Sequence, residues 1–131
     1  TSCANSIGQM AGIEALTGDQ SCVQEFKTAF KKRRDLIVEL LNNLPGVSCL
    51  VPGGAFYAFP NFSSYLNRDI SGNKFKDTFD ISEYILDRAN VVTVPGDGFG
   101  APGHIRFSYA TSTKIINEGV SRVKNALIEI T

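Results

Sequence analysis

Residues 91–112, VVTVPGDGFGAPGHIRFSYATS, constrain the possible folds of this chain more than any other stretch. They predict an apolar strand, a loop rich in proline and glycine, a second strand and the beginning of a helix. Side chains alternate along a strand, so Ile105 and Phe107 share one face and Arg106 lies on the other. Arg106 is therefore either a solvated charge at a sheet edge or a side chain placed to bind a ligand.

The loop before Arg106 favours a placed side chain. It contains four glycines and two prolines within residues 95–103, so its backbone can turn sharply and pass close to a neighbour. A guanidinium held behind such a loop can bind a carboxylate or a phosphate with two parallel hydrogen bonds.

Apolar side chains at three- and four-residue spacings predict helices on both sides of this region. The first helix ends at Gly18 and has an apolar stripe made of Ile7, Met10, Ile13 and Leu16. The second covers residues 21–44, where Ser21 and Gln24 fit a capping box. A basic cluster at residues 31–34 interrupts its stripe and indicates a solvated face beside Asp35.

A third helix is expected over residues 80–89, with Asp80 opening a capping box. Phe79 and Tyr84 are spaced as a hydrophobic staple, and Asn90 can take the left-handed conformation that ends helices. A fourth helix begins near Ser112 or Thr113. Its stripe comprises Ile116, Val120, Val123, Leu127 and Ile130.

Two strands, residues 47–51 and 55–59, flank a Pro-Gly-Gly turn and predict a hairpin in which glycine accepts a positive φ. The polar composition of residues 60–77 indicates a surface loop, with few apolar anchors, that is mobile or forms a lid. We expect one α/β domain over residues 1–131, of the two-layer α+β kind. Its helices would lie on one face of a small mixed or mainly antiparallel sheet.

Charge and cysteine usage exclude several classes of function. The chain has thirteen basic and thirteen acidic residues, so we expect neither nucleic acid nor a membrane surface as a partner. It has no apolar run long enough to span a membrane and no signal peptide layout, which favours a cytoplasmic protein. Three widely spaced cysteines and a single histidine support neither a disulfide framework nor a metal site. Small buried thiols are the expected alternative.

The motifs around Arg106 resemble those of the class I aminotransferases, the pyridoxal-phosphate enzymes of fold type I, and look most like the aspartate aminotransferase branch. The resemblance lies in VPG-x-x-FG followed by GHIRFSYATS, in P-x-G-A-F-Y at residues 52–57, and in F-x-x-R-R-D-L-I-V-E-x-L at residues 30–41. It implies that residues 1–131 are the C-terminal small domain, that the chain starts inside a longer protein, and that the cofactor-binding large domain is absent from this chain.

This resemblance also implies roles for single residues. Arg106 would bind the α-carboxylate of the substrate, and Gly54, Ser2 and Asn5 would lie in the active-site neighbourhood. For Asn5, capping of the first helix is an equally good interpretation. No lysine stands in the Ser-Lys segment that forms the Schiff base in this family, so that catalytic lysine is expected upstream. We therefore expect no catalytic and no cofactor-binding residue in this chain.

Two functions remain open from the sequence. The first is part of an aminotransferase that uses pyridoxal phosphate, acts on amino acids and 2-oxo acids, and forms a homodimer. By resemblance its reaction would convert aspartate and 2-oxoglutarate to oxaloacetate and glutamate. The second is a stand-alone α/β binding or regulatory module that holds a small anion through the glycine loop and Arg106, without catalysis.

Overall fold

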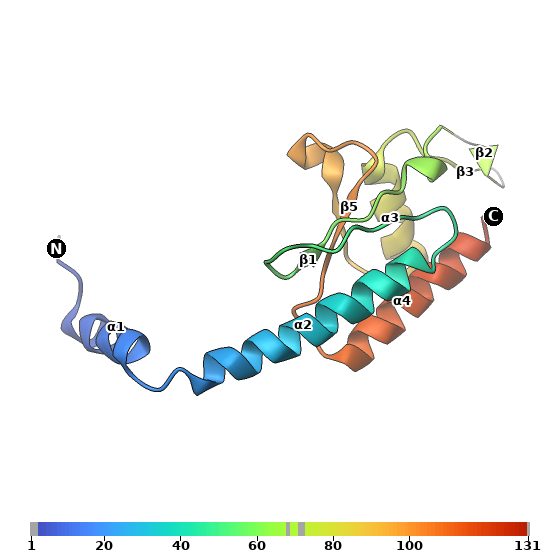
Figure 1. Ribbon diagram of the computed structural model, residues 1–131. Helices are drawn as coiled ribbons and strands as arrows, with labels where there is room; N and C mark the ends of the chain where they lie inside the picture. The colour runs from blue at the N-terminus through green and yellow to red at the C-terminus, as the bar shows by residue number, and fades with distance from the viewer. Residues whose placement is uncertain (1–2, 68, 71–72, 131) are drawn as a thin grey trace.

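The computed structural model describes residues 3–67, 69–70 and 73–130. Its elements in chain order are α1 (Ser6–Thr17), α2 (Ser21–Asn42), β1 (Tyr57–Ala58), η1 (Ser63–Tyr65), β2 (Asp69–Ile70), β3 (Asn73–Lys74), α3 (Thr78–Ala89), β4 (Val94–Pro95), η2 (Gly96–Phe99), β5 (Ile105–Ser108) and α4 (Thr113–Ile128) (Figure 1). In the described part of the chain, no helix is both long and apolar enough to cross a membrane. The α/β composition matches the expectation from sequence.

A three-stranded antiparallel sheet with the order β1-β5-β4 organises the fold. β5 is central, and its register sets Phe107 opposite Ala58 and Arg106 opposite Val94. Alternation along β5 is as predicted: Ile105 and Phe107 are buried, whereas Arg106 is only half-buried. The core lies on the Ile105 face, and alternation places Arg106 on the opposite face of β5.

Helices cover the core face of the sheet. α2 and α4 run side by side, and α3 packs against α4 and β4 (Figure 1). α4 begins at Thr113, as the sequence predicted, and Ser112 caps it by accepting a hydrogen bond from the Ile115 amide at 3.3 Å. The predicted stripe of α4 is buried throughout: Ile116, Val120, Val123, Leu127 and Ile130.

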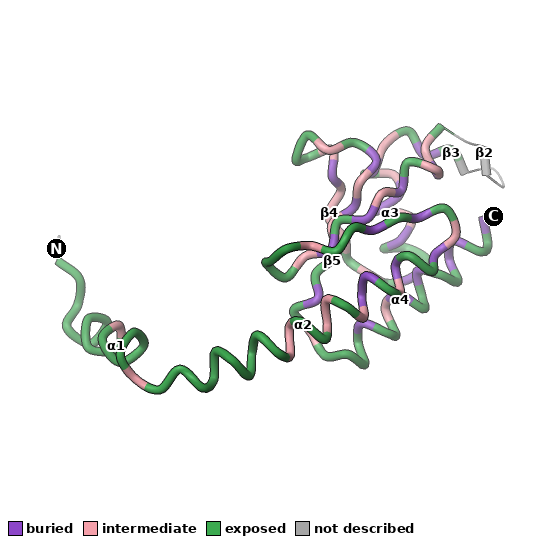
Figure 2. The backbone as a smooth tube through the Cα atoms, viewed as in Figure 1, coloured by how far each residue is buried: buried purple, intermediate pink, exposed green. Residues whose placement is uncertain are grey.

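α1 and the first half of α2 extend away from the sheet (Figure 2). The α1 helix forms as predicted but buries none of its residues, and its stripe is exposed at Ile7, Met10, Ile13 and Leu16. Val23 and Phe26 at the start of α2 are exposed as well.

Two helix starts differ from the predictions because neighbouring carboxylates take over the capping. Ser21 is the first residue of α2 and not its cap, since Asp19 accepts hydrogen bonds from the Ser21 amide and hydroxyl. α3 begins at Thr78, capped by Asp77, whose carboxylate accepts from the amides of Phe79 and Asp80. This earlier start leaves Phe79 exposed.

The staple predicted between Phe79 and Tyr84 is accordingly replaced by another contact. The Tyr84 ring packs edge-on against Phe75, with ring centroids 5.4 Å apart. Asn90 ends α3 in the left-handed conformation, with φ of 52°, as predicted.

The predicted hairpin is only partly formed. Ser48 pairs with Asn61 in a single antiparallel bridge, and residues 57–58 pair with β5. The Asn42 side chain accepts from the Cys49 amide at 2.8 Å and donates to the Cys49 carbonyl at 2.9 Å. Because this side chain satisfies both backbone groups, the segment forms no regular strand.

The segment 60–77 is better anchored than its composition suggested. Phe62, Tyr65 and Phe75 are buried, and Phe62 stacks on Phe107 with ring centroids 6.1 Å apart. The Phe62 amide donates to the Gly103 carbonyl at 2.6 Å. The expectation of few apolar anchors was wrong because these aromatic residues, spaced irregularly in sequence, meet the core through tertiary contacts.

The expectation of buried thiols holds for only one of the three cysteines. Cys49 is buried, and burial raises the pKa of its thiol. Cys3 and Cys22 are exposed, since they lie on the extended N-terminal part of the chain.

Candidate functional site

Arg106 is the centre of the candidate site. Within the described residues its guanidinium makes no hydrogen bond and no ion pair, and its charge lies instead against two aromatic rings. The guanidinium carbon is 4.4 Å from the ring centroid of Tyr57 and 5.0 Å from that of Phe99. A half-buried guanidinium with all its N–H donors unused is suited to bind a carboxylate or a phosphate.

The loop between β4 and β5 is as tightly folded as its glycines predicted. A Cβ on Gly96 would lie only 2.4 Å from the carbonyl oxygens of Ala101 and His104. That distance is too short for a side chain, so this position requires glycine. Gly103 has a left-handed φ of 78°, and a Cβ there would collide with the Ser63 hydroxyl. These contacts fix the loop that carries Phe99.

Asp97 ties this loop to the start of α3. Its carboxylate accepts hydrogen bonds from the Thr78 hydroxyl and, at 3.0 Å, from the Thr78 amide. Both hydrogen bonds from Thr78 hold the pKa of Asp97 below its ordinary value, and the bond from the hydroxyl has the larger effect.

The Asp97 contact predicts a pH-dependent stability. A carboxyl group whose pKa is lowered by folding stabilises the folded state, and this contribution is complete at pH values above the pKa of the unfolded chain, here 3.8. The contribution is lost as the pH falls through the lower pKa of the folded state. The difference in unfolding free energy between the parent and Asp97→Asn should therefore shrink as the pH falls from about 7 to about 3. Denaturant titration at several pH values measures it, with Asp87→Asn as a control for losing one exposed charge. A difference that stays constant over this range would contradict the contact.

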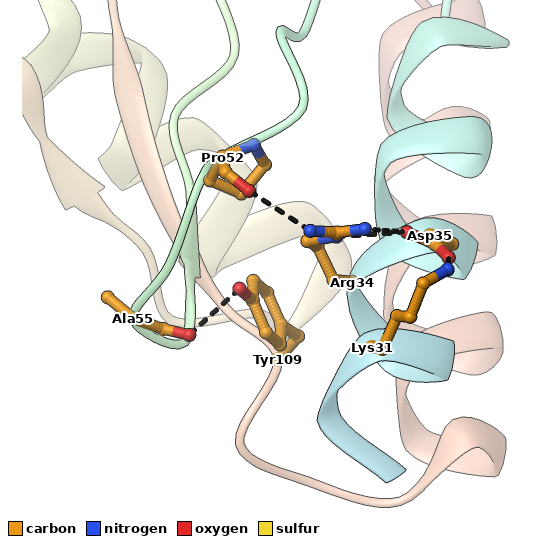
Figure 3. Close-up of polar contacts among 6 residues, drawn as sticks. All are labelled: Lys31, Arg34, Asp35, Pro52, Ala55 and Tyr109. Carbon is orange, nitrogen blue, oxygen red and sulfur yellow. Dashed lines mark hydrogen bonds and ion pairs between the residues drawn. The ribbon is translucent and has the colours of Figure 1, made fainter. Parts of the chain in front are cut away.

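The turn at residues 52–55 is held from two sides (Figure 3). Arg34 on α2 donates to the Pro52 carbonyl at 3.4 Å, and the Tyr109 hydroxyl donates to the Ala55 carbonyl at 3.0 Å. The positive φ of this turn falls on Ala55, at 60°, and not on a glycine as predicted. The bond from Tyr109 compensates the strain of that conformation, which costs a non-glycine residue about 1–2 kcal/mol.

Arg34 also corrects the interpretation of the basic cluster. Lys31 and Lys32 are exposed, as a solvated face requires, and Lys31 pairs with Asp35 at 2.7 Å. Arg34 is half-buried, and it bridges Asp35 and the turn (Figure 3).

The structure brings only some of the predicted site residues together. Gly54 lies in the turn that leads to Tyr57, and Tyr57 contacts Arg106. Asn5 caps α1 by accepting from the Gly8 amide at 2.6 Å, and α1 lies apart from β5 (Figure 1). Ser2 is outside the described residues.

Sequence reasoning missed Tyr57 and Phe99 as members of the site. Both are aromatic residues within motifs that were noted, but their contact with Arg106 depends on the pairing of β1 with β5 and on the closure of the loop. The alternation of Tyr57 with Ala58 was the only signal of which face Tyr57 would occupy.

The lysines do not form a cofactor site in this chain. All seven are exposed: Lys27, Lys31, Lys32, Lys74, Lys76, Lys114 and Lys124. A lysine that forms a Schiff base needs an enclosed setting that depresses its pKa. The described lysines therefore offer no enclosed amine for a Schiff base with pyridoxal phosphate, whereas the Arg106 guanidinium can accommodate a small anion.

Comparison with known proteins gives a consistent picture. The sequence model of the family "Aminotransferase class I and II" matches residues 1–123. The aspartate aminotransferase of Streptomyces avermitilis is 42% identical over 129 residues, which are 98% of this chain and 32% of that protein. The aspartate/prephenate aminotransferase of Nitrosomonas europaea is 39% identical over 129 residues, 97% of this chain and 32% of that protein.

Solved structures agree with these relatives. The crystal structure of the aspartate aminotransferase from Rhizobium meliloti superposes with a TM-score of 0.94 at 39% identity, covering 100% of this chain and 33% of that one. The alanine aminotransferase of Pyrococcus furiosus gives a TM-score of 0.84 at 33% identity, covering 97% and 31%. The chain thus spans about a third of the length of the relatives it matches.

Proposed function

The chain belongs to the aminotransferase class I and II family, and from this premise we propose that Arg106 binds the α-carboxylate of amino-acid and 2-oxo-acid substrates in a larger enzyme. The observation that carries the proposal is the guanidinium of Arg106, which has no polar partner among the described residues and lies on the face of β5 opposite the buried Ile105 and Phe107. Every amino acid and every 2-oxo acid presents a carboxylate that this planar fork can hold with two hydrogen bonds.

The catalytic contribution of such a clamp is positional. Two parallel hydrogen bonds to the carboxylate fix both the distance and the orientation of the adjacent α-carbon. Holding that carbon in one geometry lowers the entropic part of the barrier for the chemistry performed elsewhere in the enzyme.

We further propose that the cofactor site lies outside these 131 residues. Class I aminotransferases use pyridoxal phosphate, which supplies the electron sink for reactions at the α-carbon. The exposed lysines of this chain support a Schiff-base lysine located elsewhere, and residues 1–131 would then be the small domain of the whole enzyme.

Aspartate is the amino donor that we propose, with 2-oxoglutarate as acceptor. The names of several relatives support this choice. Discrimination of the substrate side chain would come from residues outside this chain, because Arg106 reads only the carboxylate that all substrates share.

We propose that the exposed stripe of α1 packs against another part of the enzyme or against the second subunit of a homodimer. The apolar side chains of Ile7, Met10, Ile13 and Leu16 would otherwise remain exposed to water.

One labelling experiment distinguishes the two functions, part of an aminotransferase and a stand-alone anion-binding module. The whole gene product and the 131-residue chain are each incubated with pyridoxal phosphate, reduced with borohydride, and mapped by mass spectrometry. We expect one stoichiometric lysine adduct in the whole protein, outside residues 1–131, together with transamination of aspartate, and neither in the chain alone. A whole protein that takes no adduct and shows no turnover would favour the module, and a stoichiometric adduct in the isolated chain would contradict the placement of the cofactor site.

A further inference from the structure

The guanidinium of Arg106 needs something other than polar bonds to hold its orientation. A long arginine side chain loses rotamer entropy when it is fixed in one geometry. Among the described residues no hydrogen-bond acceptor contacts the Arg106 guanidinium. The two ring contacts, at 4.4 Å and 5.0 Å, are what restrains it before a ligand arrives.

These rings come from different elements, and each is itself held. Tyr57 is on β1, opposite Ser108 of β5, which places it on the same face as Arg106. The Phe56 ring packs against the Tyr57 ring, with the ring centroids 4.2 Å apart. The turn before β1 is tied down by Arg34 and Tyr109 (Figure 3).

Phe99 is held by its loop. It ends η2, and Gly100 turns the chain after it with a left-handed φ of 69°. The bonds between Asp97 and Thr78 fix the same loop two residues earlier. Phe99 is nevertheless 56% exposed, so burial in the core does not explain its position, whereas contact with Arg106 does.

The geometry of a ring over a guanidinium has a chemical consequence. The ring occupies a face of the planar cation, where it is attracted by the charge, and leaves the in-plane N–H donors free. An acidic partner would restrain the arginine equally well, but it would use those donors and compete with the substrate.

We propose that Tyr57 and Phe99 are positioning residues that orient Arg106 for two-point binding of the substrate carboxylate. This inference rests on the proposed function of Arg106. It assigns the two rings a role through Arg106 and no direct part in the chemistry.

The test uses the whole enzyme and the variants Tyr57→Leu and Phe99→Leu. Each should raise the KM for aspartate by about tenfold with little change in kcat, from the loss of one cation–ring contact in a partly desolvated site. Tyr57→Phe keeps the ring and should stay within about twofold of the parent. Phe79→Leu is the matched control, because Phe79 is 54% exposed and no guanidinium of the described residues lies over its ring.

A double-mutant cycle separates positioning from a structural role. In an Arg106→Lys background there is no planar guanidinium to orient, so the effect of each leucine variant should fall to within about twofold. Equal losses in both backgrounds, or a Tyr57→Phe variant as impaired as Tyr57→Leu, would overturn the inference.

The cycle also distinguishes the two levels of the proposal. If Arg106→Ala is harmless, the function proposed for Arg106 fails. If Arg106→Ala is severe while both leucine variants leave KM unchanged, only the positioning role fails. Thermal unfolding of each variant confirms that the comparison is made between folded enzymes.

Discussion

Replacing Arg106 with alanine in the whole enzyme is expected to lower kcat/KM by at least about a hundredfold. The charge-assisted bidentate pair that would be lost is worth about 3 kcal/mol, and each 1.36 kcal/mol is a factor of ten in rate. The loss should be shared by every amino-acid substrate, because each carries the same α-carboxylate. Arg106→Lys keeps the charge but lacks the planar fork, so it should also be impaired, though less than alanine.

Folding should survive this substitution, since Arg106 is half-buried and lies on the face opposite the core. Arg122→Ala is the matched control: it removes an exposed arginine whose ion pair with Glu118 lies on the surface of α4. Steady-state kinetics with aspartate and a second amino acid, together with thermal unfolding, make the measurement. If Arg106→Ala kept kcat/KM within a few-fold of the parent, or unfolded the protein, Arg106 would be a surface or structural residue.

Phe62→Ala should destabilise the 131-residue chain by about 3–5 kcal/mol, the usual cost of emptying a fully buried aromatic site. Phe62 is 0% exposed and packs against Phe107 and Tyr65. The total stability of a small protein is about 5–15 kcal/mol, so this one deletion would remove a large part of it.

Phe26→Ala is the control, because it removes the same phenyl ring from a residue that is 63% exposed. It should change the free energy of unfolding of the same chain by less than about 1 kcal/mol. Urea unfolding followed by circular dichroism gives both values. A small effect at Phe62 would mean that the segment 60–77 is the weakly anchored surface loop that its composition suggested.

Relations between residues close in sequence were predictable. The spacing of Ile116, Val120 and Val123 identified the buried face of α4, and its start near Thr113 was predicted. In β5, alternation alone placed Arg106 on the side away from the core. These features depend on the periods of helix and strand, which are properties of the local backbone.

Competition between nearby groups was harder to judge from the sequence. Ser21 and Asp80 both fit the pattern of a helix cap, but Asp19 bonds Ser21, and Asp77 caps α3. Several adjacent polar side chains could satisfy the same backbone amides, and the geometry of the entering chain selects among them.

The sequence by itself determined that an arginine would stand on an open strand face behind a glycine-rich loop, and its motifs resembled those of the aminotransferases. Only the tertiary structure decided what surrounds that arginine. Tyr57 reaches it through the pairing of β1 with β5, and Phe99 through a loop that Asp97 ties to Thr78. Strand register and loop closure join residues far apart in the chain, so no local period encodes them, and they form only when the core brings the elements together.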